Sequence, residues 1–177
     1  DPALDVGGGD AAQKISLLAS FAFGRWIDYR RVLCEGITRV TPKDIAFCQS
    51  SGFTVKLIAM ARMIDGRPLV AVFPALVPHD HPLAGVQNEF NGVLVDSDFL
   101  GPSVFEGRGA GGNPTASSVA SDLGDLVKAL RCGVLSPAEP ILPGGELYPV
   151  EKMVCRYYFH FVTDNRPGIW ALVTGMC

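Results

Sequence analysis

Two long β-rich runs joined by a turn signal constrain the fold of this chain more than any other feature. Residues 53–64 and 69–76 are rich in β-branched, aromatic and other apolar side chains, as strands usually are. Residues 65–68 have the sequence Asp-Gly-Arg-Pro, which favours a turn. Two strands joined by a tight turn form an antiparallel hairpin. We therefore expect a β-hairpin that belongs to the sheet core and to a subunit interface rather than to a ligand site.

Two helices are predicted before this hairpin, the first from apolar spacing and the second from start and stop signals. Residues 10–23 carry apolar side chains at helical intervals, and Gly24 fits the position just after the last turn. Thr41 followed by Pro42 is typical of a helix start, with Thr41 as the N-cap. Gly52 then ends this short second helix.

Further strand and helix signals flank the hairpin. We expect an extended stretch at residues 32–37 and strands at residues 93–95 and 104–106. A helix then begins at Asn113-Pro114 and presents one apolar face that we expect to be buried. That face consists of Val119, Leu123, Leu126 and Leu130. Together the signals predict an α+β fold, with a mixed, largely antiparallel sheet and helices packed on one face.

The last quarter of the chain indicates a different organisation. Residues 133–152 are rich in Pro and Gly without a period, which predicts a linker after a domain at residues 1–132. Residues 156–162 alternate like a strand, and residues 169–174 begin a helix. Residues 153–177 therefore form a truncated βα unit, which is too short to bury a core of its own.

Composition indicates a compact globular protein without a nucleic-acid or membrane partner. Of the 177 residues, 48% are hydrophobic and 19% are charged. The net charge is −3, and no basic stripe is interleaved with aromatic residues. No apolar run approaches membrane-spanning length, and no secretory signal is present. We therefore expect a cytoplasmic protein.

Neither the cysteines nor the histidines predict a metal site. The five cysteines are odd in number and show no C-x-x-C spacing, so reduced thiols are the simpler interpretation. They are Cys34, Cys48, Cys132, Cys155 and Cys177. His79 and His81 stand on either side of Asp80, but no third ligand follows at a characteristic spacing. We expect a solvated loop there.

A carboxylate and an ammonium stand together where the first helix begins. Asp10 has the position of an N-cap, and Lys14 lies four residues on, so both side chains project from one face. Such a pair can orient a small zwitterionic substrate and move a proton. The alternative is a capped surface helix with an ordinary ion pair. The spacing alone leaves both interpretations open.

A glycine-rich segment precedes the long third helix. Residues 107–112 have the sequence Gly-Arg-Gly-Ala-Gly-Gly and fit the pattern G-x-G-x-x-G. A dinucleotide-binding fingerprint also requires an acidic residue at the end of the next strand. The downstream acids Asp122 and Asp125 instead fall inside the predicted helix, and no further βαβ unit follows. We therefore reject a Rossmann domain at this position.

Four segments, in order, resemble homoserine dehydrogenases. The first is Asp1-Pro2 followed by Asp5-Val-x-Gly-x-Asp-Ala-Ala-x-Lys14, which is similar to the substrate-site segment of that family. The others are residues 32–45, residues 81–84 with 90–95, and residues 107–117. Residues 153–177 resemble the start of an ACT regulatory domain.

The resemblance implies roles for individual residues. Lys14 would donate or shuttle the proton during hydride transfer, and Asp10 would bind polar groups of the substrate. Asp5 matches a second acidic contact to substrate, although a turn residue before three glycines is an equal alternative. Gly109 and Gly111 resemble a loop that packs against the bound nucleotide, and a tight strand-to-helix turn is the alternative.

The resemblance also implies an activity. The parent enzyme would interconvert L-aspartate 4-semialdehyde and L-homoserine with NAD or NADP, in the route to threonine, methionine and isoleucine, as a homodimer joined through the sheet. The nucleotide-binding domain, an essential glutamate and the ligands of a sodium ion would lie upstream of Asp1, so we assign no metal ligand. The other hypothesis is a non-catalytic dimerisation or ligand-binding segment without turnover of its own.

One loop departs from the family pattern, and a second loop matches it. The three consecutive glycines at positions 7–9 predict a flexible approach to the first helix. Glu35, in Cys-Glu-Gly-Ile, matches the family, and we assign it no role beyond packing or turn geometry.

Overall fold

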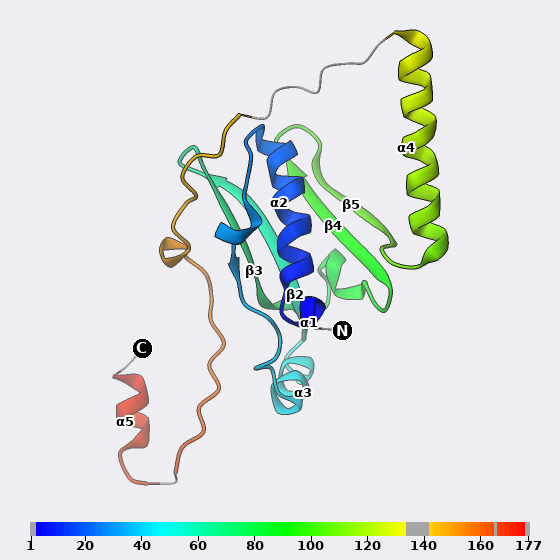
Figure 1. The fold of residues 1–177 in the computed structure, drawn as a ribbon. Helices are drawn as coiled ribbons and strands as arrows, with labels where there is room; N and C mark the ends of the chain where they lie inside the picture. The colour runs from blue at the N-terminus through cyan, green and yellow to red at the C-terminus, as the bar shows by residue number, and fades with distance from the viewer. Residues whose placement is uncertain (1–2, 134–141, 165, 176–177) are drawn as a thin grey trace.

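The computed structural model describes residues 3–133, 142–164 and 166–175, and it has the predicted mixture of helices and sheet. A three-stranded sheet has the order β1-β3-β2, with β2 antiparallel and β1 parallel to β3. A separate antiparallel pair is formed by β4 and β5 (Figure 1). The strands are β1 (Leu33–Cys34), β2 (Phe53–Ile64), β3 (Arg67–Pro78), β4 (Phe90–Ser97) and β5 (Gly101–Arg108).

The predicted hairpin is confirmed as β2 and β3, with a tighter turn than expected. Asp65 and Gly66 both have left-handed backbones, with φ of 49° and 72°. Two such residues make a type I′ turn, whose twist matches that of the flanking strands. Ile64 consequently pairs directly with Arg67. Arg67 and Pro68, which we expected in the turn, are therefore the first residues of β3.

Helix α2 (Gly9–Phe23) covers one face of this sheet (Figure 1). Its buried side chains are small, so the helix backbone lies close to the strands. They are Ala12, Ser16, Ala19 and Ser20. The buried Ser20 hydroxyl donates to the Ser16 carbonyl at 2.6 Å, and the hydroxyl oxygen accepts the Ile27 N–H at 2.9 Å. Gly24 ends the helix with φ of 62°, as predicted.

The approach to α2 differs from two expectations. Residues Ala3–Val6 form a one-turn helix, α1, and the chain then turns at Gly8, which is buried and has φ of 83°. The Gly8 carbonyl accepts the Ala12 N–H at 2.9 Å, so Gly8 is the N-cap and Asp10 lies inside the first turn. The prediction of Asp10 as N-cap was therefore wrong, and the three glycines are held in a defined turn.

Helix α3 (Pro42–Ser50) begins as predicted. Thr41 and Asp44 form a capping box, in which each side chain accepts the backbone N–H of the other residue. In the described part of the chain, three short 3₁₀ helices complete the connections. They are η1 (Tyr29–Arg31), η2 (Pro82–Gly85) and η3 (Val150–Lys152).

Helix α4 (Gly112–Cys132) is present where it was expected, but the prediction of a buried face was wrong. None of its residues is buried, and its four predicted core side chains are all about half exposed. Figure 1 shows the physical reason: α4 projects beyond β4 and β5 instead of lying on a sheet. Within the described residues, no helix is long and apolar enough to cross a membrane.

Residues 142–164 follow the body of the molecule in an extended path (Figure 1). Part of the predicted linker packs on the core, because Leu147 contacts the core cluster and the Tyr148 N–H donates to the Pro68 carbonyl at 2.8 Å. Residues 134–141 of that linker lie outside the described residues. The predicted strand at residues 156–162 was wrong, since it pairs with no described strand, whereas the last helix is present as α5 (Ile169–Thr174).

Candidate active site

The Asp10–Lys14 pair lies on the outer face of α2, opposite the residues that pack on the sheet. The Lys14 ammonium and the Asp10 carboxylate are 2.6 Å apart. Their side chains remain 54% and 44% exposed, so a substrate can reach both charges. An exposed ion pair adds little to stability. The pair is therefore more informative as a candidate site than as a structural contact.

Asp5 lies in α1, one short turn before this pair. Its side chain is exposed, and its carbonyl accepts the Gly8 N–H at 3.1 Å. The backbone of Asp5 thus takes part in the turn that leads into α2. Asp5 and Asp10 stand on either side of the Gly8 turn, and no hydrogen bond or ion pair joins their side chains in the described part of the chain.

The glycine loop at residues 109–111 is held by β4. The Gly109 N–H donates to the Glu89 carbonyl at 3.0 Å, and a Cβ at Gly109 would lie 1.2 Å from the Asn91 amide nitrogen. A side chain at position 109 would therefore require the exposed Asn91 side chain to change its rotamer. Gly111 has φ of 116° and precedes α4, and no atom except those of Pro114 lies within 4 Å of its Cβ position. Gly111 is the more open of the two glycines.

A second polar cluster, which sequence reasoning missed, centres on Asp44. Its carboxylate, only 10% exposed, accepts the Thr41 N–H at 2.8 Å and the Thr41 hydroxyl at 2.6 Å. The Tyr158 hydroxyl donates to the same carboxylate at 2.9 Å, and His160 Nδ1 lies 2.6 Å from it. These hydrogen bonds, first those from Thr41, hold the pKa of Asp44 well below its usual range. Burial and the neighbouring Asp44 raise the pKa of Tyr158.

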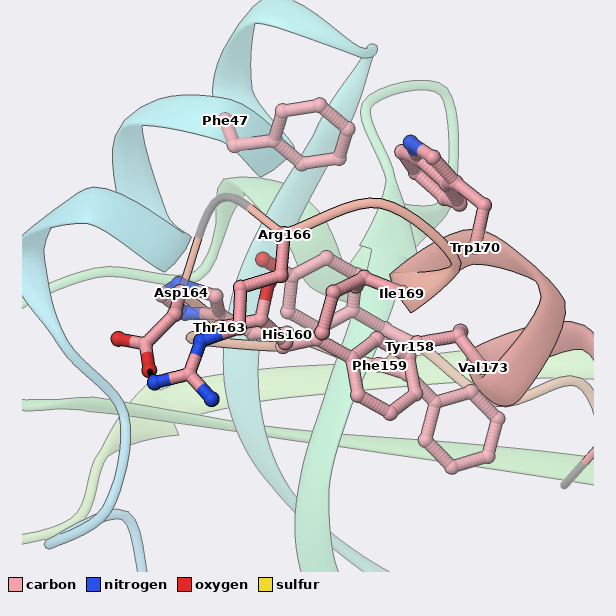
Figure 2. Close-up of a pocket in the computed structure, with 11 residues that line it drawn as sticks. Phe47, Tyr158, Phe159, His160, Thr163, Asp164, Arg166, Ile169, Trp170 and Val173 are labelled. Atoms are coloured by element: carbon pink, nitrogen blue, oxygen red, sulfur yellow. Dashed lines mark ion pairs between the residues drawn. The ribbon is translucent and has the colours of Figure 1, made fainter.

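An open hollow of about 450 Å³ lies beside this cluster, between α3 and the C-terminal segment. Figure 2 shows Phe47 of α3 and Trp170 of α5 among the residues that line it. Asp164 and Arg166 form an ion pair of 3.0 Å at the same hollow. Neither Asp10 nor Lys14 lines it, so the hollow is separate from the candidate active site.

The histidine loop holds no cluster of metal ligands in the described residues. His79 is exposed, and the His81 ring nitrogen accepts the Leu83 N–H at 3.2 Å, where it caps η2. Residues 3–133, 142–164 and 166–175 contain no group of three or more His, Cys, Asp or Glu that could hold a metal ion. His81 therefore has a structural role at the start of η2.

Comparison with known proteins points to one family. The family model for homoserine dehydrogenase matches residues 1–123. The homoserine dehydrogenase of Synechocystis sp. is 42% identical over 179 residues, which cover 96% of this chain and 41% of that protein. The homoserine dehydrogenase of Mycobacterium tuberculosis is 41% identical over 181 residues, which cover 98% of this chain and 40% of that protein.

Solved structures agree with this assignment. The crystal structure of a homoserine dehydrogenase from Thiobacillus denitrificans matches with a TM-score of 0.84 and 29% identity, over 99% of this chain and 42% of that one. The S. aureus enzyme at pH 6.5 matches with a TM-score of 0.69 and 34% identity, over 78% of this chain and 34% of that one. This chain thus spans about two fifths of the length of the curated relatives it matches. It belongs to the homoserine dehydrogenase family.

Proposed function

We propose that the protein catalyses the interconversion of L-aspartate 4-semialdehyde and L-homoserine with NAD(P)H as the hydride donor. The observation that carries this proposal is the Asp10–Lys14 pair. It lies within the segment matched by the family model, with both charges open to solvent at the start of α2. Participation in the synthesis of threonine, methionine and isoleucine, in the cytoplasm, follows from the same proposal.

Lys14 supplies the proton in this proposal. When bound, the nicotinamide cofactor provides a hydride to the aldehyde carbon of the substrate. Negative charge then develops on the carbonyl oxygen, and the Lys14 ammonium stabilises that charge and donates a proton to the oxygen. Asp10, 2.6 Å from the ammonium, holds Lys14 in place and has a second oxygen for the substrate's amino group. Asp5 is the second substrate contact that we propose.

The nucleotide would lie against the glycine loop before α4. Gly111 suits this role, because its Cβ position has only ordinary contact with Pro114 and it precedes a 21-residue helix. The Gly109 N–H already donates to the Glu89 carbonyl. Gly109 would therefore contact the nucleotide by close packing of its backbone and not by a hydrogen bond. Most of the nucleotide site would belong to a separate domain of the full-length protein, and residues 153–177 would begin an ACT domain after a linker at 133–152.

The test is NADPH oxidation with aspartate semialdehyde by the full-length protein that carries this sequence. We expect turnover, and we expect Lys14→Ala to lower kcat by about 100-fold or more because the proton donor is lost. Nucleotide binding should change little. Lys128→Ala is the matched control, because it removes a similar exposed lysine, 2.8 Å from Asp125 on α4.

Two results would contradict the proposal. Absence of turnover in the full-length protein would reject the activity, and an unchanged kcat in Lys14→Ala would remove Lys14 from its role.

The second candidate function is a dimerising or ligand-binding segment without turnover, which concerns the 177-residue chain by itself. We expect that chain to be inactive in the same assay, since residues 3–133, 142–164 and 166–175 contain no dinucleotide-binding βαβ unit.

A further inference from the structure

The turn that connects α1 to α2 determines where the Asp10–Lys14 pair is placed. Gly8 has a left-handed backbone and is buried, and its carbonyl accepts the Ala12 N–H at 2.9 Å. The first turn of α2 therefore starts from Gly8. Any displacement of residues 6–9 moves the helix start that carries Asp10 and Lys14.

A loop from a distant part of the sequence presses against this turn. The Ile37 N–H donates to the Val6 carbonyl at 2.9 Å, and the Cys34 thiol donates to the Gly7 carbonyl at 3.3 Å. Between these two bonds lies Gly36. A Cβ at Gly36 would lie 2.3 Å from the Val6 carbonyl oxygen and 2.8 Å from the Gly7 Cα. Both neighbours are backbone atoms, so they cannot move aside by a change of rotamer.

The same loop is anchored in the core. Cys34 pairs with Val72 in the parallel β1–β3 ladder, and the Glu35 N–H donates to the Val72 carbonyl at 2.8 Å. Val72 is fully buried in the cluster that α2 covers. A Cβ at Gly8 would lie 2.9 Å from the Cys34 sulfur. Close contacts thus run without interruption from the sheet through residues 34–37 to the start of α2.

We propose that residues 34–37 are a positioning element for the active site, and that Gly36 sets the place of the Asp10–Lys14 pair. This inference rests on the proposed function. Gly36 itself does not touch substrate; it acts through the Val6–Gly8 turn. A displacement of about 1 Å at a catalytic group can lower the rate by about 100-fold. The absence of a side chain at position 36 therefore has a catalytic consequence.

The first test is Gly36→Ala in the full-length protein. The new methyl group displaces the turn, and we expect kcat for aspartate semialdehyde to fall by about tenfold or more, while the KM for the nucleotide stays within about twofold. Gly85→Ala is the matched control, because among the described residues no atom beyond its immediate chain neighbours lies within 4 Å of its Cβ position, and its φ is not positive. An unchanged kcat in a folded Gly36→Ala protein would overturn the proposal.

A double variant separates positioning from general damage. If Gly36 acts through Lys14, then Gly36→Ala combined with Lys14→Ala is no slower than Lys14→Ala alone. If the loss of kcat in the double variant equals the product of the losses in the two single variants, the proposal is contradicted.

Cys34 provides a milder probe. We expect Cys34→Ala to lower kcat. Cys34→Ser keeps a donor for the Gly7 carbonyl, so we expect it to restore kcat. Failure of the serine variant to restore kcat would count against the role of that hydrogen bond.

A readout without substrate distinguishes this inference from the proposed activity. The Ala12 amide is bonded to Gly8, so its hydrogen exchange reports directly on the turn. We expect exchange at Ala12 to accelerate by about tenfold in Gly36→Ala and to stay unchanged in Gly85→Ala. If the full-length protein shows no turnover but Ala12 exchanges faster in Gly36→Ala, the proposed function fails, whereas the positioning of the turn by residues 34–37 is supported. Unchanged exchange at Ala12 in Gly36→Ala would overturn the positioning role of residues 34–37.

Discussion

Asp44 shows how one carboxylate can connect parts of the chain that are far apart in sequence. It closes the capping box of α3 with Thr41, and it also receives Tyr158 and His160 from the C-terminal segment. The Tyr158 ring stacks on Phe47 of the same helix, with ring centroids 5.8 Å apart. Two of the four polar contacts to this nearly buried carboxylate, those from Tyr158 and His160, hold residues 158–160 against α3.

This arrangement predicts an acid-sensitive contact. The folded-state pKa of Asp44 is lowered by its hydrogen bonds, so the stability it contributes is fully present above the ordinary carboxyl pKa of about 4. That stability is lost as the pH falls below 4 and the carboxylate becomes protonated. We expect Asp44→Asn to be less stable than the wild type at pH 7 and to lose less stability between pH 5 and pH 3. Urea unfolding at a series of pH values measures both effects.

The control for this prediction is Tyr158→Phe, which removes one hydrogen bond and leaves the carboxylate in place. Its pH dependence should lie between those of the wild type and Asp44→Asn. Equal pH slopes for Asp44→Asn and the wild type would show that Asp44 is not a source of the acid sensitivity.

At the level of elements, α2 and α4 show two outcomes of the same apolar periodicity. Both were predicted as helices from apolar spacing, and a buried face was predicted for α4. Helix α2 buries small residues against β2 and β3, whereas α4 has no buried residue. Helical spacing determines which side chains share a face, but it contains no information on whether another element covers that face. Only the position of α4 beyond the sheets decides its exposure.

Two leucine substitutions measure this difference. Leu69 is 1% exposed in β3, and Leu126 is 49% exposed in α4. We expect Leu69→Ala to lower the free energy of unfolding of the 177-residue chain by about 2–5 kcal/mol, because it leaves a cavity. Leu126→Ala should change it by less than about 0.5 kcal/mol, because no buried contact is lost. Urea denaturation of both variants checks this. Similar losses at the two positions would show that the α4 face is covered in solution.

At the scale of the whole molecule, the proposed dimer depends on the sheet face opposite α2. Leu57, Ala59 and Ala61 of β2 pack against the core cluster under α2, so the alternating Ile58 points to the other face. We propose that this second face meets the same face of another copy. A symmetric contact of this kind is the commonest form of homo-oligomer.

Sedimentation equilibrium of the chain tests the dimer. We expect a concentration-dependent dimer in the wild type and a shift to monomer in Ile58→Lys, because a lysine in a self-complementary apolar face places two like charges together. Leu126→Lys makes the same chemical change on the exposed face of α4 and should leave the dimer intact. Dissociation caused by Leu126→Lys instead would place the contact on α4 and contradict a sheet-mediated dimer.

The sequence by itself determined most of the local elements and the family. Each of these elements depends on neighbouring residues: the turn signal at Asp65-Gly66 and the Thr41 cap are readable within a few positions. The pairing of Asp10 with Lys14 is equally local, because one helical turn separates them.

Only the tertiary structure decided the contacts that join distant segments. Asp44 meets Tyr158 across 114 positions, and Gly36 meets Val6 and Gly7 across about 30. The exposure of α4 and the unpaired path of residues 156–162 belong to the same class. The physical reason is that burial and pairing are properties of two surfaces, whereas periodicity describes one. A pattern along one segment cannot state which other segment lies against it.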